Sequence, residues 1–562
     1  MCDKDYSKHL NDNLSVFLDR QSHCNKMNKA ASIDVHEVFA RYFIGCEALA
    51  YALSSRLEDG SICLDMEEYL SDKELWELNP FLVDNPGLLR EQVQQSSFVT
   101  HSPEILKPFV INNGKAYLQR YYRYETEIIA NIRRLGTNFH IVTGGPGTGK
   151  TYSIGFRLIE KFTHKPGLKV ALAAPTGKAA ARMKEALKDF VKSQENKIKD
   201  SIGSSITNLN AQTIHRLLGY RRDSVFFRYD EKNRLPFDLV IIDECSMIDG
   251  AMMAKLLNAV DGKSELWLIG DKDQLASIEA GSVFGDLCRA GSAPLLDGKV
   301  ELKTENWRFR PDRGIGRLSK EIIDGKFNNA DSYSGDNEVT INIIKSDNPG
   351  ENLFREKVLK SDYFREYASL YSEYINKESV KEALDSLDKI RFLCVTRTND
   401  YGVAEVNKAI EKHLKTVIGD ENIFCPREGF YHNQPVIITK NDYNLKVYNG
   451  DVGLIRKEGD AYLAWVETAE GEVRSIPAGY LNHFETAYAM TIHKSQGSEF
   501  ENVFLILPEK QGEMLLTREL LYTGLTRARN KAVIMAPPES LQRCIERSVS
   551  RASGLEYRLL NE

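Results

Sequence analysis

Short, continuous apolar runs alternate with longer amphipathic stretches over most of this chain of 562 residues. One set of runs lies within residues 139–270 and comprises FHIVT, KVALAA, DLVIID and ELWLIG. A second set lies within residues 391–535 and comprises RFLCV, NVFLIL and KAVIM. Apolar strands separated by helices are typical of parallel sheets that helices cover on both faces. The pattern therefore predicts an α/β fold with two lobes.

Two regions have a different pattern of apolar and polar residues. Residues 1–110 are predicted to be mostly helical, because apolar residues recur at helical spacing over 38–57. The segment at about 430–485 has short strands joined by turns such as YNGD and AEGE, which predicts a small β-barrel. We therefore expect an N-terminal helical domain at 1–110, a first lobe at 111–300, and a second lobe at 301–562 that carries the barrel as an insert.

Composition excludes several classes of protein. The chain is 42% apolar and 27% charged, and it has no apolar run of about 18 residues, so no transmembrane helix is expected. The N-terminus is polar and acidic and has no signal-peptide core. Nine scattered cysteines without a CxxC pair suggest neither a zinc site nor a disulfide framework. We expect a cytoplasmic protein with reduced thiols.

The charge is unevenly distributed. Residues 1–110 hold 10 Lys and Arg against 18 Asp and Glu, a net charge of −8, whereas the remainder has a net charge of +2. An acidic segment repels phosphate, so residues 1–110 are a poor DNA-binding surface. They are better suited to forming a separate helical unit or to docking on another protein. If the remainder binds DNA, it must do so through local patches.

A glycine-rich loop follows the first strong strand. Residues 144–151, GGPGTGKT, match G-x-x-x-x-G-K-[ST] between a predicted strand and a predicted helix. Glycines let backbone N–H groups approach phosphate, and the helix N-terminus adds a favourable field. Lys150 can then reach the β- and γ-phosphates of ATP, and the Thr151 hydroxyl can bind Mg²⁺. The predicted nucleotide-binding residues of this loop are Gly144, Gly145, Pro146, Gly147, Thr148, Gly149, Lys150 and Thr151.

An acidic pair ends the strand DLVIID about 90 residues after the loop. Asp243 is placed to hold Mg²⁺, and Glu244 is placed to polarise the attacking water as a general base. Acids at the end of a strand are common, so the pair alone is a weak signal. Downstream of a phosphate-binding loop, it predicts hydrolysis of ATP.

Further motifs indicate what the ATPase acts on. APTGKAA and TIHRLLG lie between the loop and the acidic pair, and GDKDQL, NWRFR, IHKSQGSEF and YTGLTRAR follow the pair, so that these motifs span residues 174–529. In this order and spacing the chain resembles the superfamily 1 helicases. DECSMID, YNGDVG and AMTIHKSQGSEF are similar to the RecD-like branch, the family of the α subunit of exodeoxyribonuclease V. The resemblance covers about 115–555 and fits the acidic N-terminal segment only loosely.

The resemblance implies two RecA-like P-loop NTPase lobes and an SH3-like form for the inserted barrel. It also implies roles for residues outside the loop. Gln119 is expected to contact adenine, and Gln274 to sense the γ-phosphate. Arg308 and Arg527 are expected to act as arginine fingers from the second lobe, because guanidinium groups stabilise charge on the transferring phosphoryl group. The implied catalytic set is Lys150, Asp243, Glu244, Gln274, Arg308 and Arg527.

A set of DNA-facing side chains is also implied by the resemblance. It consists of Thr176, Thr213, His215, Thr491 and His493. Hydroxyl and amide groups can hold phosphates without reading base sequence, which suits a motor that must accept any base. A single Thr or His, taken without the motifs, is more often structural. The family implies translocation 5′→3′ along single-stranded DNA.

Three functions remain open. The first is the RecD-like subunit of a helicase/nuclease that acts in double-strand-break repair and recombination, with RecB-like and RecC-like partners; the nuclease would then belong to a partner. The second is a free-standing RecD-like helicase, although such proteins usually carry longer N-terminal regions with helix-hairpin-helix elements, and none is identified here. The third is a non-catalytic DNA clamp or assembly scaffold that only binds ATP, against which the intact catalytic set argues.

Two segments outside the motifs have structural interpretations. Residues 178–199 have the spacing of a solvated amphipathic helix. The aromatic run SVFFRYD, residues 224–230, is interpreted as one strand of a β-hairpin that turns at YDEKNRLP. Stacking of these rings on bases is the alternative.

Overall fold

The chain divides into two compact units, the first made of Met1–Arg56 and Asp65–Ala116 and the second of Leu57–Leu64 and Tyr117–Glu562. A computed structural model describes residues 33–102, 104–221, 224–327, 329–347, 351–419, 429–442, 444–468, 473–510, 512–549 and 551–561. None of the described helices is both long and apolar enough to cross a membrane.

The first unit combines short helices with a small sheet. Its helices are α2 (Val35–Ala40), α3 (Glu47–Glu58), α4 (Met66–Ser71), α5 (Lys73–Glu77) and α6 (Leu88–Gln95). The strands β1 (Leu64–Asp65), β4 (Lys115–Leu118), β3 (Phe109–Asn112) and β2 (Val99–Thr100) are neighbours in that order. The carboxylates of Asp34, Asp65 and Asp72 accept hydrogen bonds from backbone N–H groups at the starts of α2, α4 and α5. Some of the acidic residues in this segment therefore cap helices.

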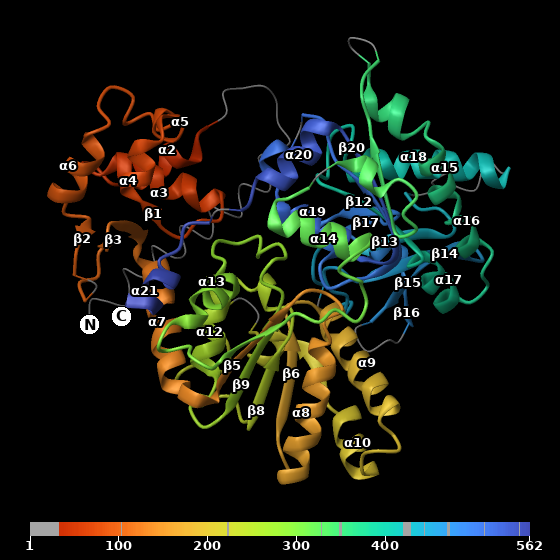
Figure 1. Cartoon of the computed structure of the whole chain (residues 1–562), viewed down its shortest axis with the longest axis horizontal. Coiled ribbons are helices and arrows are strands. Elements are labelled where there is room, and N and C mark those ends of the chain that lie inside the picture. Colours follow the sequence, from red (N-terminus) through yellow and green to blue (C-terminus); the bar gives the residue numbers. More distant parts are fainter. Residues whose placement is uncertain are drawn as a thin grey trace. The chain divides into compact units, whose positions relative to one another are not determined.

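The first lobe of the second unit contains a six-stranded parallel sheet (Figure 1). The strand order is β10 (Val300–Lys303), β5 (Phe139–Gly144), β9 (Glu265–Gly270), β8 (Leu239–Ile242), β6 (Val170–Ala174) and β7 (Ala211–Thr213). Successive residues of a strand enter different cores: Ile141 packs with Val240, whereas Val142 packs with Ile241. Both faces of the sheet are therefore buried, which explains the continuous apolar runs.

Helices precede or follow most of these strands. They are α7 (Gln119–Leu135), α8 (Lys150–His164), α9 (Gly177–Ser193), α10 (Asp200–Thr207), α11 (Ile214–Leu217), α12 (Gly250–Ala259) and α13 (Val283–Arg289). The amphipathic helix predicted at 178–199 is α9, which buries Met183, Leu187 and Phe190. Because parallel strands end at one edge of the sheet, the segments that follow β5, β8 and β9 lie close together.

The second lobe has its own parallel sheet, which confirms the predicted α/β class with parallel sheets. The strand order is β11 (Val339–Ile343), β20 (Ala528–Ala536), β19 (Phe500–Ile506), β12 (Ile390–Cys394) and β18 (Ala489–Thr491). The main helices are α14 (Gly314–Asp324), α15 (Asp362–Ser369), α16 (Ser372–Ile375), α17 (Val380–Leu387), α18 (Val403–Ile418), α19 (Arg518–Leu525) and α20 (Pro538–Glu546).

A five-stranded antiparallel sheet interrupts this lobe within the predicted insert. Its order is β16 (Val473–Pro477), β15 (Ala461–Glu467), β14 (Val452–Glu458), β13 (Gln434–Ile438) and β17 (Phe484–Thr486). It has a small core of its own, in which Val436, Ile455 and Val466 are buried. Strand β17 leads almost directly into β18, so the insert immediately precedes the TIHKSQGSE segment.

The last helix, α21 (Leu555–Asn561), differs from the expected division of lobes. The predicted boundaries place it in the second lobe, but Leu555 and Leu559 pack into the core of the first lobe. The buried carboxylate of Glu125 on α7 accepts hydrogen bonds from the Gly554 N–H at 2.8 Å and the Ser553 hydroxyl at 3.1 Å. The chain therefore returns to the first lobe after completing the second.

The hairpin predicted from the aromatic run is wrong. Residues 224–235 contain no strand. The backbone N–H groups of Arg228 and Tyr229 instead donate to the carbonyl oxygens of Gly219 and Leu218, both at 3.0 Å. Phe227 packs against the core of the first lobe, whereas Phe226 is 73% exposed. Long-range packing of one ring outweighs the local pattern.

Candidate active site

The predicted phosphate-binding loop joins β5 to α8, with Gly144 ending the strand and Lys150 beginning the helix. Gly147 and Gly149 have φ angles of 79° and 72°, a left-handed backbone that favours glycine. A Cβ atom on Gly147 would lie 2.5 Å from Cβ of Arg308. The loop therefore needs glycine both for its backbone and for the close approach of another segment.

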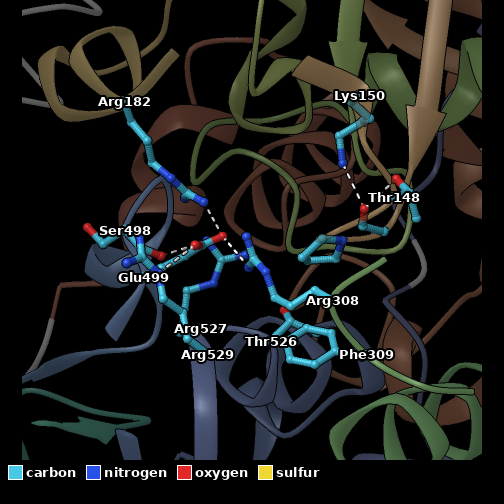
Figure 2. Close-up of polar contacts among 12 residues, drawn as sticks. Thr148, Lys150, Arg182, Arg308, Phe309, Ser498, Glu499, Thr526, Arg527 and Arg529 are labelled. Atoms are coloured by element: carbon cyan, nitrogen blue, oxygen red, sulfur yellow. Dashed lines mark hydrogen bonds and ion pairs between the residues drawn. The ribbon is translucent and has the colours of Figure 1, made fainter. Parts of the chain in front are cut away.

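The side chains of the loop are held by its own backbone. The Lys150 ammonium donates to the carbonyl oxygens of Gly144 at 2.5 Å and of Gly145 at 3.0 Å. The Thr148 hydroxyl donates to the Gly145 carbonyl at 2.7 Å. Figure 2 shows Lys150 and Thr148 side by side at this loop. The ammonium thus lies over the loop, where it is suited to phosphate oxygens. Thr151 follows in the first turn of α8.

The acidic pair comes directly after β8, as predicted. Glu244 has a φ angle of 54°, which is uncommon outside glycine, and its N–H donates to Asp243 Oδ1 at 2.8 Å. Burial and the neighbouring Glu244 raise the pKa of Asp243, while the Lys150 ammonium opposes this effect. Two adjacent, partly buried carboxylates repel each other, so a nearby cation stabilises their ionised forms. Asp243 and the Thr151 hydroxyl therefore suit Mg²⁺.

Gln274 lies in a buried polar cluster that includes the second lobe. Its amide nitrogen donates to Oδ2 of Asp271 at 3.0 Å, and the Tyr522 hydroxyl of α19 donates to the same oxygen at 2.9 Å. The Leu275 N–H donates to the Thr523 hydroxyl at 2.9 Å. The amide oxygen of Gln274 is buried and has no hydrogen-bond partner among the described residues. Gln274 is therefore connected to the second lobe and retains an unused polar atom.

Gln119 is the first residue of α7. Its amide oxygen is also buried without a hydrogen-bond partner in the described part of the chain. A buried amide oxygen of this kind costs free energy unless it is paired, and the amino group of adenine is a suitable donor. The glycine-rich loop and the unpaired amide oxygen of Gln119, which can accept from the adenine amino group, therefore fit ATP.

The two predicted arginine fingers lie close to one carboxylate, that of Glu499, but only Arg308 forms an ion pair with it among the described residues. Arg527, which is 2% exposed, donates from Nε to the Thr523 carbonyl at 3.1 Å and from Nη1 to the Ser498 carbonyl at 3.2 Å. Arg308 pairs through Nη1 with Oε1 of Glu499 at 2.5 Å. Figure 2 shows the Arg308 side chain pointing toward Glu499 and away from Lys150. The sequence motifs did not single out Glu499, although it lies within IHKSQGSEF.

Asn306 is a second residue that the motifs did not single out. Its amide nitrogen donates to the Pro146 carbonyl at 2.9 Å. Its amide oxygen accepts from the N–H groups of Arg308 at 3.0 Å and Phe309 at 2.8 Å. One side chain thus fixes the turn that carries Arg308 onto the phosphate-binding loop. The asparagine that opens NWRFR was the available signal.

Three of the predicted DNA-facing residues are threonines whose hydroxyl groups cap turns. Thr176 accepts from the Ala179 N–H at 3.2 Å, Thr213 from the Arg216 N–H at 3.3 Å, and Thr491 from the Lys494 N–H at 3.2 Å. Each bond is a local capping interaction. A DNA contact by these threonines stays a prediction.

The two predicted histidines differ in exposure. His215 is exposed, and its ring lies 5.8 Å from that of Phe227. His493 is half-buried, and burial lowers its pKa. A Cβ atom on Gly497 would lie 3.2 Å from Cβ of Ala179, so the loop that contains His493 packs against the start of α9. The structure therefore brings the APTGKAA and TIHKSQGSE segments together.

Two family models match parts of this chain. A model described as an AAA domain matches residues 127–280, and one described as a UvrD-like helicase C-terminal domain matches residues 486–535. A crystal structure of a Bacteroides Pif1 helicase bound to single-stranded DNA aligns with 75% of this chain and 93% of that chain, at 17% identity and a TM-score of 0.37. A similarity this low contributes nothing to the assignment.

Sequence relatives are more informative. The RecBCD enzyme subunit RecD of Mycolicibacterium smegmatis is 35% identical over 91% of this chain and 93% of its own length. The subunit of the same name from Haemophilus influenzae is 33% identical over 78% of this chain and 73% of its own. The ATP-dependent RecD2 DNA helicase of Deinococcus radiodurans is 29% identical over 70% of this chain but only 46% of its own. With similarity along nearly the whole of both chains, this protein belongs to the RecD family of superfamily 1 DNA helicases.

Proposed function

We propose that this ATP-dependent DNA helicase of the RecD family moves 5′→3′ along single-stranded DNA as one subunit of a RecBCD-type helicase/nuclease. The observation that supports the proposal is that residues of both lobes meet beside the predicted phosphate-binding loop. Lys150, Asp243 and Gln274 come from the first lobe, and Arg527 and Tyr522 come from the second. Such a site couples nucleotide chemistry to movement between lobes.

Each residue of the site has a proposed role. The N–H groups of residues 144–149 and the Lys150 ammonium hold the phosphates, and the Gln119 amide selects adenine. Thr151 and Asp243 would hold Mg²⁺, which neutralises phosphate charge when bound. Glu244 takes a proton from the attacking water. Arg308 and Arg527 stabilise the charge that develops on the transferring phosphoryl group.

We propose that Gln274 is coupled to the DNA-facing loop through the neighbouring residue Leu275. The next residue, Leu275, accepts at its carbonyl oxygen from the Gln496 side chain at 2.8 Å. Gln496 lies in the 491–499 loop, which also carries the proposed DNA contacts Thr491 and His493. A shift at Gln274 on hydrolysis would therefore reach the DNA-facing loop through one backbone carbonyl. Repeated cycles would move the lobes along the strand.

The assembly is proposed from the family and from the charge of the first unit. The relatives from Mycolicibacterium smegmatis and Haemophilus influenzae, which are similar over most of their length, are named as RecBCD subunits, which supports RecB-like and RecC-like partners. Residues 1–110 carry a net charge of −8, which favours a protein partner over DNA. We assign partner docking to this N-terminal domain and nuclease activity to a partner. The antiparallel sheet within 430–485 is proposed to be an SH3-like barrel.

A free-standing helicase is the second candidate, and the similarity to the RecD2 helicase favours it. Affinity purification of the tagged chain from its native cells separates the two. The subunit proposal predicts two large chains in equal amounts with it. If instead the purified chain alone unwinds 5′-tailed duplexes rapidly and nothing co-purifies, the free-standing helicase is correct. Unwinding of 3′-tailed duplexes alone would contradict the proposed polarity.

A further inference from the structure

The carboxylate of Glu499 is buried among arginines (Figure 2). Its side chain is only 4% exposed. Oε1 pairs with Arg308 at 2.5 Å and with Arg182, and Oε2 pairs with Nε of Arg529 at 3.1 Å. The buried guanidinium of Arg527 lies beside them, because it donates to the carbonyl of Ser498, the preceding residue. One carboxylate therefore forms ion pairs within a cluster of guanidinium groups.

The partners of Glu499 come from different parts of the second unit. Arg182 lies on α9 of the first lobe, and Arg529 lies on β20 of the second. Arg308 follows β10, in the segment that leads from the first lobe to the second. Glu499 itself ends the 491–499 loop, just before β19. The carboxylate thus connects both lobes at the site of the proposed arginine finger.

Charge explains why this carboxylate stays ionised. Burial alone would raise its pKa, but Arg182 and then Arg308 outweigh burial, and together with the other arginines lower the pKa of Glu499 to about 2. A buried carboxylate is costly unless its oxygens are paired, and here both are. Without it, several guanidinium groups would repel one another in the same small volume.

Arg308 is anchored at both ends, yet most of its guanidinium remains available. Asn306 and Gly147 fix its backbone over the phosphate-binding loop. Nη1 is bound by Glu499, whereas Nε and Nη2 have no hydrogen-bond partner among the residues that the structure describes. A guanidinium group held through one nitrogen can still present its other donors to an oxyanion.

We propose that Glu499 is the positioning residue of Arg308: it anchors Nη1 and leaves Nε and Nη2 to meet the transferring phosphoryl group. The inference rests on the proposed function, because it takes Arg308 as an arginine finger. Sharing the carboxylate with Arg182 and Arg529 fixes the finger relative to both lobes. The 491–499 loop, which carries the proposed DNA contacts, thereby sets where the finger lies.

Steady-state ATP hydrolysis with saturating single-stranded DNA tests this role. Glu499→Gln is expected to lower kcat by roughly 10- to 100-fold, with KM for ATP within about twofold of the wild type. Glu501→Gln is the matched control, because Glu501 is exposed on β19 two residues away. An unchanged kcat for Glu499→Gln, or a loss that appears only in KM, would overturn the proposal.

The double variant Glu499→Gln/Arg308→Ala separates positioning from a general structural role. If Glu499 acts through Arg308, the double variant has the same kcat as Arg308→Ala; multiplied losses would contradict that dependence. If Glu499→Gln does not fold, Glu499→Asp is used in its place, because it keeps the negative charge. The shorter side chain is expected to lower kcat several-fold at an unchanged melting temperature, and full activity would reject positioning. Full activity of Arg308→Ala would refute the arginine finger itself.

Discussion

The Tyr522 hydroxyl donates a hydrogen bond to Oδ2 of Asp271 at 2.9 Å, and the Gln274 amide donates to the same oxygen at 3.0 Å. Burial raises the pKa of both Asp271 and Tyr522. A Cβ atom on Gly145 would lie 2.8 Å from the Tyr522 hydroxyl. This tyrosine of the second lobe therefore touches the phosphate-binding loop and orients the proposed γ-phosphate sensor.

Tyr522→Phe removes one hydrogen bond without changing the shape of the ring. A net loss of about 1 kcal/mol at Asp271 corresponds to roughly a fivefold lower kcat for DNA-stimulated ATP hydrolysis. KM for ATP should be unchanged, because Tyr522 is not among the proposed phosphate ligands. Tyr557→Phe is the control, because the Tyr557 side chain is exposed on the outer face of α21. Equal kcat values for the two variants would show that Gln274 is oriented without Tyr522.

Gly147 and Gly419 have similar left-handed backbones, with φ angles of 79° and 74°. A Cβ atom on Gly147 would collide with Arg308, whereas one on Gly419 would meet nothing within 4 Å. Both alanine variants should lose about 1 kcal/mol of stability to backbone strain. Only Gly147→Ala should also abolish ATP hydrolysis. Measuring melting temperature and ATPase rate together checks this, and an active Gly147→Ala enzyme would contradict the close approach of Arg308.

Gln119→Ala should weaken selection of the base. The buried amide oxygen has no partner in the described part of the chain, so its proposed partner is adenine. We expect KM for ATP to rise about tenfold, since each lost hydrogen bond to a substrate group costs roughly 1 kcal/mol or more. KM for GTP should change little. A parallel rise for both nucleotides would place Gln119 away from the base.

Asp286 on α13 gives a prediction for stability against pH. Burial, opposed by Arg289, raises the pKa of this carboxyl from 3.8 to about 7. The folded protein therefore binds the proton more tightly than the unfolded chain. The free energy of unfolding must fall as pH rises from about 4 to about 7, by an amount on the order of a few kcal/mol.

The variant Asp286→Asn removes that dependence. Its free energy of unfolding relative to the wild type should increase between about pH 4 and about pH 7 and level off above that, as followed by thermal unfolding. Asp331→Asn, at an exposed position, should track the wild type throughout. If the free energy of unfolding of Asp286→Asn also falls with rising pH, in parallel with that of the wild type, the pKa of Asp286 is not raised in the folded state.

The parallel sheets and the loop at 144–151 could be predicted because their signals are local. Buried strands have continuous apolar sequences, and the P-loop needs particular residues at fixed spacing. Contacts between distant segments have no such local signal. Nothing near Leu555 indicates that it packs in the core of the first lobe, and nothing in SQGSEF indicates that Glu499 meets Arg182. The hairpin failed for the same reason, because the packing of Phe227 is a tertiary effect.

ATP hydrolysis by the purified chain, measured with and without single-stranded DNA, tests the central claim most directly. DNA should stimulate the wild type at least roughly tenfold, because the lobes that meet at the ATP site also carry the proposed DNA contacts. Lys150→Ala should abolish hydrolysis at an unchanged melting temperature, whereas Lys188→Ala, on the exposed face of α9, should behave as the wild type. If single-stranded DNA does not stimulate ATP hydrolysis, or if Lys150→Ala still hydrolyses ATP, an ATP-driven DNA motor built on this site is contradicted.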